Sequence, residues 1–147
     1  MTTSENVSAE TVDSHSVEET FALGRRLATE LRPGAVVALY GELGAGKTVL
    51  VKAIARALGF AGAVTSPTFT IIHEYPTDPP IYHVDLYRLN TEQEALEVGI
   101  EEYLRGRGVC IVEWADRIER LLPPRALAVH IEVVSETARR FTIRRPC

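Results

Sequence analysis

Eight residues from Gly41 to Thr48 are the part of the sequence best suited to carry chemistry. They read Gly-Glu-Leu-Gly-Ala-Gly-Lys-Thr and match the pattern G-x-x-x-x-G-K-[ST] at every fixed position. Glycines let a backbone point successive amide N–H groups inward around an anion. The helix expected after the loop adds its unpaired donors and its partial positive charge. The segment therefore predicts a site for nucleotide phosphates formed by Gly41, Leu43, Gly44, Ala45, Gly46, Lys47 and Thr48.

Two side chains of this loop have expected roles of their own. A lysine at the position of Lys47 reaches the β- and γ-phosphates, and a hydroxyl at the position of Thr48 ligates Mg²⁺. The expected cofactors are thus ATP or ADP with Mg²⁺, and Lys47 is a candidate catalytic residue. The alternative is a Gly-rich turn that only starts a helix. It is disfavoured because a buried strand is expected directly before the motif and a helix directly after it.

Two acidic residues stand where a Mg-nucleotide site needs them. Asp85 follows the run Ile-Tyr-His-Val, and Glu113 follows Val-Cys-Ile-Val, both typical of buried strands. Acids at the carboxyl ends of strands beside the loop can reach its rim. We expect Asp85 and Glu113 to take part in Mg²⁺ binding and in catalysis. One would hold the ion, directly or through water, and the other would polarise the attacking water. Their spacing does not decide which acid does which.

The segment over residues 65–70 reads Thr-Ser-Pro-Thr-Phe-Thr and lies between the second expected helix and the next strand. The hydroxyls of Ser66 and Thr68 beside a rigid proline suit a switch loop that senses the γ-phosphate. An ordinary Ser/Thr/Pro turn explains the same composition equally well.

The four histidines are scattered along the chain without metal-ligand spacing on an evident helix. All four are therefore expected to be structural or on the surface. His83 is the least clear of them because it lies two residues from Asp85.

The elements that must position these residues alternate along the middle of the chain. Strands are predicted at Thr11–Ser14, Ala35–Tyr40, Thr68–Tyr75, Ile81–Tyr87, Gly108–Glu113, Ala126–Val134 and Arg139–Ile143. Helices are predicted at Val17–Leu31, Lys47–Leu58 with Gly59 as its C-cap, Thr91–Leu104 with Gly99 as the point where it would break, and Ala115–Leu122. Short connections imply antiparallel pairing of the third with the fourth strand and of the last two, whereas strand–helix alternation implies parallel pairing in the middle. The predicted fold class is α/β: a P-loop NTPase-like mixed sheet with a parallel core and antiparallel additions, flanked by helices.

Length and composition fit one compact domain. The chain has 147 residues, of which 46 % are hydrophobic, so we expect a flexible N-terminus over residues 1–9 and a single P-loop ATPase domain over 10–147. No apolar run approaches the roughly 18 residues of a membrane helix, and the polar, acidic N-terminus does not read as a signal peptide. Two cysteines form no disulfide framework, so a cytoplasmic location and no membrane partner are expected.

The charge is unevenly distributed. The net charge is −4, whereas Arg117–Cys147 holds seven arginines and three glutamates and is therefore +4. A basic tail could meet an acidic partner, but solvated arginines on a short hairpin are the favoured interpretation. The net negative charge of the whole chain argues against strong independent binding of nucleic acid.

Four stretches together resemble one family, namely Gly41–Thr48, Ser66–Thr70, His83-Val-Asp-Leu-Tyr-Arg88 and Ile111-Val-Glu-Trp114. The chain is similar to the TsaE family, also called YjeE, the ATPase of bacterial tRNA threonylcarbamoyladenosine biosynthesis. The resemblance runs from about Thr11 to Ile143. It implies an ATPase that is weak alone and works with a TsaB–TsaD-like complex, so that tRNA is involved only indirectly.

Site roles also follow from the resemblance. It implies that Thr48 and Glu113 bind Mg²⁺, that Asp85 is the Walker-B-like acid at the nucleotide, and that Ser66–Thr70 is the switch loop. It further implies that Val17 and Thr137 neighbour the adenine, although no sharp motif marks them.

A kinase, a GTPase and a nucleotide-gated scaffold are the alternative functions. A kinase would need a lid, and the span from Gly59 to Asp85 is too short for one. A GTPase would often carry Asn-Lys-x-Asp, which neither Asn6 nor Asn90 begins. A nucleotide-gated scaffold or assembly protein without significant hydrolysis is the open alternative, which an ATPase assay with and without partners separates from an enzyme.

Overall fold

The computed structural model describes residues 7–42, 44–64 and 71–146. Within them the strands form one seven-stranded sheet in the order β1-β7-β6-β2-β5-β4-β3. The central four strands pair in parallel, while β1 and β7 on one side and β3 on the other are antiparallel. The predicted fold class, a mixed sheet with a parallel core, is confirmed. The strands are β1 (Val7–Ser14), β2 (Val36–Tyr40), β3 (Ile72–Tyr75), β4 (Ile81–Asp85), β5 (Val109–Glu113), β6 (Leu127–Val133) and β7 (Arg139–Pro146).

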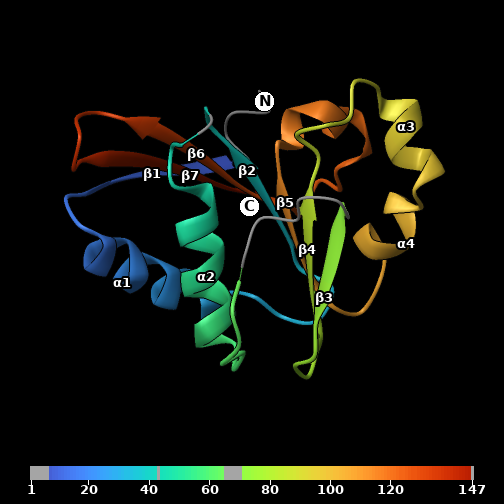
Figure 1. Ribbon diagram of the computed structural model, residues 1–147, viewed down its shortest axis with the longest axis horizontal. Coiled ribbons are helices and arrows are strands. Elements are labelled where there is room, and N and C mark those ends of the chain that lie inside the picture. Colours follow the sequence, from blue (N-terminus) through green and yellow to red (C-terminus); the bar gives the residue numbers. More distant parts are fainter. Residues whose placement is uncertain (1–6, 43, 65–70, 147) are drawn as a thin grey trace.

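Helices cover both faces of the sheet (Figure 1). Their bounds are α1 (Val17–Ala28), α2 (Lys47–Ala57), α3 (Glu92–Glu97), α4 (Ile100–Leu104) and the 3₁₀ helix η2 (Ala115–Leu121). Because side chains alternate along a strand, β2 supplies both layers of the core. Val37 and Leu39 pack with α1 and α2, whereas Val36 and Ala38 pack with α3, α4 and η2. This two-sided burial explains the continuous apolar run of β2.

Helices α1 and α2 approach each other closely at Gly24. A Cβ on Gly24 would lie 2.3 Å from the Cβ of Ala53 on α2. Glycine is therefore required at this crossing for steric reasons. The helix that starts at the phosphate loop is thereby packed against the helix that follows β1.

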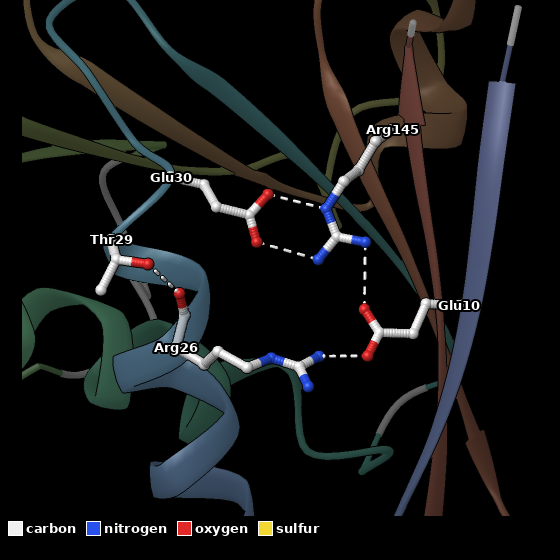
Figure 2. A network of polar contacts seen from close by, with 5 residues as sticks. All are labelled: Glu10, Arg26, Thr29, Glu30 and Arg145. Atoms are coloured by element: carbon white, nitrogen blue, oxygen red, sulfur yellow. Dashed lines mark hydrogen bonds and ion pairs between the residues drawn. The ribbon is translucent and has the colours of Figure 1, made fainter.

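An ion-pair network ties α1 to strands β1 and β7, as Figure 2 shows. Arg145 donates to both carboxylate oxygens of Glu30, at 2.7 and 2.9 Å, and to Glu10 at 3.0 Å. Arg26 donates to the other oxygen of Glu10 at 2.6 Å. The hydrogen bond from Arg145 is the main reason why the pKa of Glu10 lies below its ordinary value. Arg145, one of the arginines of the basic C-terminal segment, thus pairs with carboxylates of its own domain.

Several predicted boundaries differ from the structure. Strand β1 begins at Val7, so residues 7–9, expected to be frayed, pair with β7. Helix α1 ends at Ala28 rather than near Leu31, because Thr29 caps it and its hydroxyl donates to the carbonyl of Arg26. Strand β7 extends to Pro146, three residues past the prediction.

The connections around the middle helices follow the sequence more closely. Gly59 occupies the position after the C-cap Leu58, with φ +105°, and the amide of Phe60 donates to the carbonyl of Ala55. Strand β4 ends at Asp85, whereas the sequence predicted that it would continue to Tyr87. The expected break at Gly99 is confirmed, since it separates α3 from α4 with φ +81°. No helix in the described ranges is long and apolar enough to span a membrane.

Candidate functional site

The predicted phosphate loop connects the end of β2 to the start of α2. Gly46 precedes α2 with φ +103°, a conformation that side chains rarely adopt. A Cβ at Gly41 would lie 2.8 Å from the carbonyl oxygen of Ile131 on β6, so glycine lets the loop leave the sheet between neighbouring backbones. From β7, Arg139 donates to the carbonyl of Ala45 at 3.1 Å and fixes the middle of the loop. The motif predicts glycine at both positions, whereas it does not predict the hydrogen bond from Arg139 to the loop.

Lys47 is buried although it is charged, with 5 % of its surface exposed. Its Nζ donates to the carbonyl of Gly41 and, at 3.1 Å, to that of Glu42. The same nitrogen lies 3.8 Å from the centre of the Trp114 ring, a cation–π arrangement. The ammonium is therefore held under the loop by its own backbone and one aromatic face.

The two predicted acids lie side by side at the carboxyl edge of the sheet. Asp85 and Glu113 are register partners across the parallel strands β4 and β5. Burial lowers the pKa of Lys47, and the charges of Glu113, Asp85 and Asp116 oppose that shift. Burial raises the pKa of Asp85, a 3.0 Å hydrogen bond from the backbone amide of Tyr87 to Oδ1 lowers it, and the charge of Glu113 adds to the rise. The structure thus brings Lys47 and both acids into one electrostatic unit.

His83 joins this unit through a bond to Glu113 that the sequence did not predict, although His83 was the least clear of the four histidines there. It was expected to be structural or on the surface, and it is fully buried with its Nε2 2.6 Å from Oε2 of Glu113. Its Nδ1 lies 2.8 Å from the hydroxyl of Tyr75. The i, i+2 spacing of His83 and Asp85 places both on one face of a strand, and this was the available signal.

A cavity of about 380 Å³ lies beside the loop, between α1 and the β6–β7 hairpin. Val17 and Thr137, the two residues expected near adenine, both line it, and Gly46 and Val49 line it from the loop and α2. The other lining residues are Ser14, His15, Ser16, Thr20, Glu136, Arg139 and Phe141. Two distant segments thus meet at the phosphate loop. Leu43, Ser66 and Thr68 lie outside the described residues.

Comparison with known proteins identifies the relatives of this chain. The family model for "Threonylcarbamoyl adenosine biosynthesis protein TsaE" matches residues 14–141. This chain belongs to the TsaE family. Among curated members, tRNA threonylcarbamoyladenosine biosynthesis protein TsaE from Bacillus subtilis is 45 % identical over 126 residues, covering 85 % of this chain and 78 % of that protein. TsaE from Treponema pallidum is 36 % identical over 130 residues, covering 88 % of this chain and 96 % of that protein.

A solved structure has the same fold as this chain. The crystal structure of YdiB from Bacillus subtilis superposes with a TM-score of 0.78 at 37 % sequence identity. The superposition covers 96 % of this chain and 88 % of YdiB. The family membership expected from the four sequence stretches and the fold class expected from the alternation of strands and helices are therefore confirmed.

The donors near the TsaE loop fit Mg²⁺, a hard cation that prefers oxygen ligands. Thr48 in the first turn of α2 offers a hydroxyl, and Asp85 and Glu113 offer carboxylates. Burial and like charge disfavour the ionised form of Asp85, a cost that a cation would relieve. Among the described residues no group of three or more His, Cys, Asp or Glu could hold a metal. Mg²⁺ in nucleotide sites takes its remaining ligands from phosphate and water.

Proposed function

We propose that this TsaE-family chain is a Mg²⁺-dependent ATPase required for threonylcarbamoyl modification of the tRNA adenosine next to the anticodon. It acts with a TsaB–TsaD-like complex and meets tRNA only indirectly. The observation that carries the proposal is the convergence of Lys47, Asp85 and Glu113 at the G-x-x-x-x-G-K-T loop. The relatives' names supply the biosynthetic role.

Each residue of the site has one task in this proposal. The loop amides from Leu43 to Thr48 hold the phosphates, and Lys47 donates to the β- and γ-phosphate oxygens. Thr48 and Glu113 hold Mg²⁺, which when bound neutralises charge on the phosphates. Asp85 stands beside them as the acid that orients the attacking water.

The cavity that contains Val17 and Thr137 suits a nucleobase. It adjoins the phosphate loop through Gly46, and its walls combine apolar and hydroxyl groups with His15, Glu136 and Arg139. Thr20 is buried in it and shares a 2.8 Å hydrogen bond with Ser14. Because the chain lacks Asn-Lys-x-Asp, we expect adenine there rather than guanine.

Hydrolysis should be slow in the isolated protein. Phosphoryl transfer depends on positioning and charge stabilisation, and a group supplied in trans can raise its rate by roughly 10³–10⁵-fold. We therefore assign the partner contact to the mouth of the site and to the segment with Ser66 and Thr68, so that docking accelerates hydrolysis.

The test combines binding with turnover. Calorimetric titrations with ATP, ADP, GTP and GDP should show tighter binding of the adenine nucleotides; equal or tighter binding of guanine nucleotides refutes that assignment. Steady-state hydrolysis should rise when the cognate TsaB–TsaD pair is added, and a Ser66→Ala/Thr68→Ala variant should lose the rise at unchanged nucleotide affinity. Binding without hydrolysis under any condition would favour the nucleotide-gated scaffold.

A further inference from the structure

A buried chain of hydrogen bonds crosses three neighbouring strands and ends at the site. It runs from Tyr75 on β3 through His83 on β4 to Glu113 on β5. The three residues are 5 %, 0 % and 2 % exposed, respectively. Buried polar groups are costly unless paired, and here each one satisfies the next.

The order of donors along this chain follows from chemistry. An ionised carboxylate only accepts, so Nε2 of His83 donates to Oε2 of Glu113 across 2.6 Å. In a neutral imidazole Nδ1 is then the acceptor, and the hydroxyl of Tyr75 donates to it across 2.8 Å. Burial and the charge of Glu113 raise the pKa of Tyr75 to about 12, so the phenol keeps its proton at neutral pH. With a neutral imidazole, the Tyr75 hydroxyl thereby favours the tautomer whose Nε2 proton faces the carboxylate.

Tyr75 is itself fixed by the core. Its ring stacks on Phe60, which follows α2, with centroids 4.5 Å apart and planes 17° from parallel. Both rings belong to the core layer under α1 and α2. The Tyr75 end of the hydrogen-bond chain is therefore held in place by the packed core.

We infer that His83, oriented by Tyr75, is a positioning residue that sets the orientation of the Glu113 carboxylate at the phosphate loop. The last torsion of a glutamate is broad and has no sharp preference of its own. A hydrogen bond to Oε2 selects one orientation, and so fixes where Oε1 lies. Partners of this kind behind metal-binding carboxylates typically change metal affinity or activity by 10–100-fold when removed. The inference rests on the proposed role of Glu113 in holding Mg²⁺.

The test measures how much Mg²⁺ tightens ATP binding, as the ratio of calorimetric Kd values in EDTA and in excess Mg²⁺. His83→Leu should reduce this ratio by about 10-fold while the Kd in EDTA stays unchanged. Tyr75→Phe, which removes one hydroxyl and keeps the ring, should reduce it by about 3-fold. His83→Gln, whose amide can donate to Glu113, should restore most of the ratio.

Two further variants separate positioning from general damage. His73 lies opposite His83 in the β3–β4 ladder, and His73→Leu should leave the ratio at its wild-type value. In a Glu113→Gln background His83→Leu should have no additional effect, because His83 acts through that carboxylate.

The results of these experiments distinguish failure of the positioning role of His83 from failure of the proposed function. A wild-type ratio in folded His83→Leu, or equal losses of affinity with and without Mg²⁺, overturns the positioning role. If His83→Leu does not fold, Tyr75→Phe and His83→Gln decide. A wild-type ratio in Tyr75→Phe, together with a ratio in His83→Gln as low as that of Glu113→Gln, overturns the positioning role. If the wild-type protein shows no Mg²⁺-dependent gain at all, the proposed function fails first.

Discussion

Replacing Gly24 by alanine tests how tightly the fold holds α1 against α2. The added Cβ would lie 2.3 Å from the Cβ of Ala53, and 3.1 and 3.2 Å from the carbonyl carbon of Ala53 and the amide nitrogen of Ile54. Carbon atoms pack at roughly 3.5–4.0 Å, so the helices must separate by about 1.5 Å. Overpacking of this kind costs about 1–3 kcal/mol.

A competing effect acts in the opposite direction. Alanine is better than glycine inside a helix by about 0.8–1.0 kcal/mol. The steric term is the larger one, because the closest contact is with a buried side chain and two further contacts are with backbone. A contact as short as 2.3 Å places the steric cost in the upper part of its range, about 2–3 kcal/mol. After the propensity gain of about 1 kcal/mol, we expect Gly24→Ala to lower the free energy of unfolding by about 1–2 kcal/mol.

Urea denaturation measures this loss, provided that the m-value is unchanged. Ala22→Gly, at an exposed position of the same helix, measures the propensity term alone. Adding Ala53→Gly should relieve the closest contact, so the double variant should lose less stability than the sum of the two single variants. Relief should be partial because the backbone contacts remain. A Gly24→Ala protein as stable as the wild type, or more so, would refute the steric argument.

Three further predictions concern charge. Lys47→Ala should abolish or greatly weaken ATP hydrolysis with the fold intact, whereas Lys52→Ala on the same helix should not; wild-type hydrolysis in Lys47→Ala removes the loop from the mechanism. Glu113→Gln should weaken Mg²⁺-dependent nucleotide binding, and Asp85→Asn should reduce hydrolysis more than binding; normal hydrolysis in both contradicts the acid assignment. Arg145→Gln should lower the free energy of unfolding by at most about 1 kcal/mol at neutral pH. Its effect should shrink as pH falls below about 4.5, the ordinary pKa of Glu10, because the unfolded chain binds a proton there while the lowered pKa keeps the folded carboxyl ionised. The effect should be lost once the folded carboxyl is also protonated at lower pH; a pH-independent loss would exclude the ion pairs as its cause.

Local sequence patterns were sufficient to predict most of the strands and helices of the fold. The runs that became β2 and β5 are apolar because both faces of each strand are covered, so their location could be predicted from the sequence. The break between α3 and α4 was signalled by Gly99, which takes a positive φ there. The end of α1 depended on a hydroxyl cap at Thr29, which competes with an apolar pattern that continues to Leu31.

The contacts that complete the site were not accessible to such patterns. The bond from His83 to Glu113 joins residues 30 positions apart, and the bond from Arg139 to Ala45 joins residues 94 apart. Both depend on which strands are neighbours and in what register, and sequence periodicity specifies neither. The same holds for the cavity, whose two walls are brought together only when β1 pairs with β7.

The order of the central strands explains why the charged groups meet at one point. Strand β5 lies between β2 and β4, and the parallel register places Glu113 level with both Leu39 and Asp85. The phosphate loop begins two residues after Leu39, so a cation from α2 and two carboxylates from the neighbouring strands converge at the same edge of the sheet. Burial alone would drive Lys47 toward its neutral form, and the two acids oppose this. In the proposed function the carboxylates that suit Mg²⁺ also favour the charged form of the lysine that would bind phosphate, and one strand register places them for both tasks.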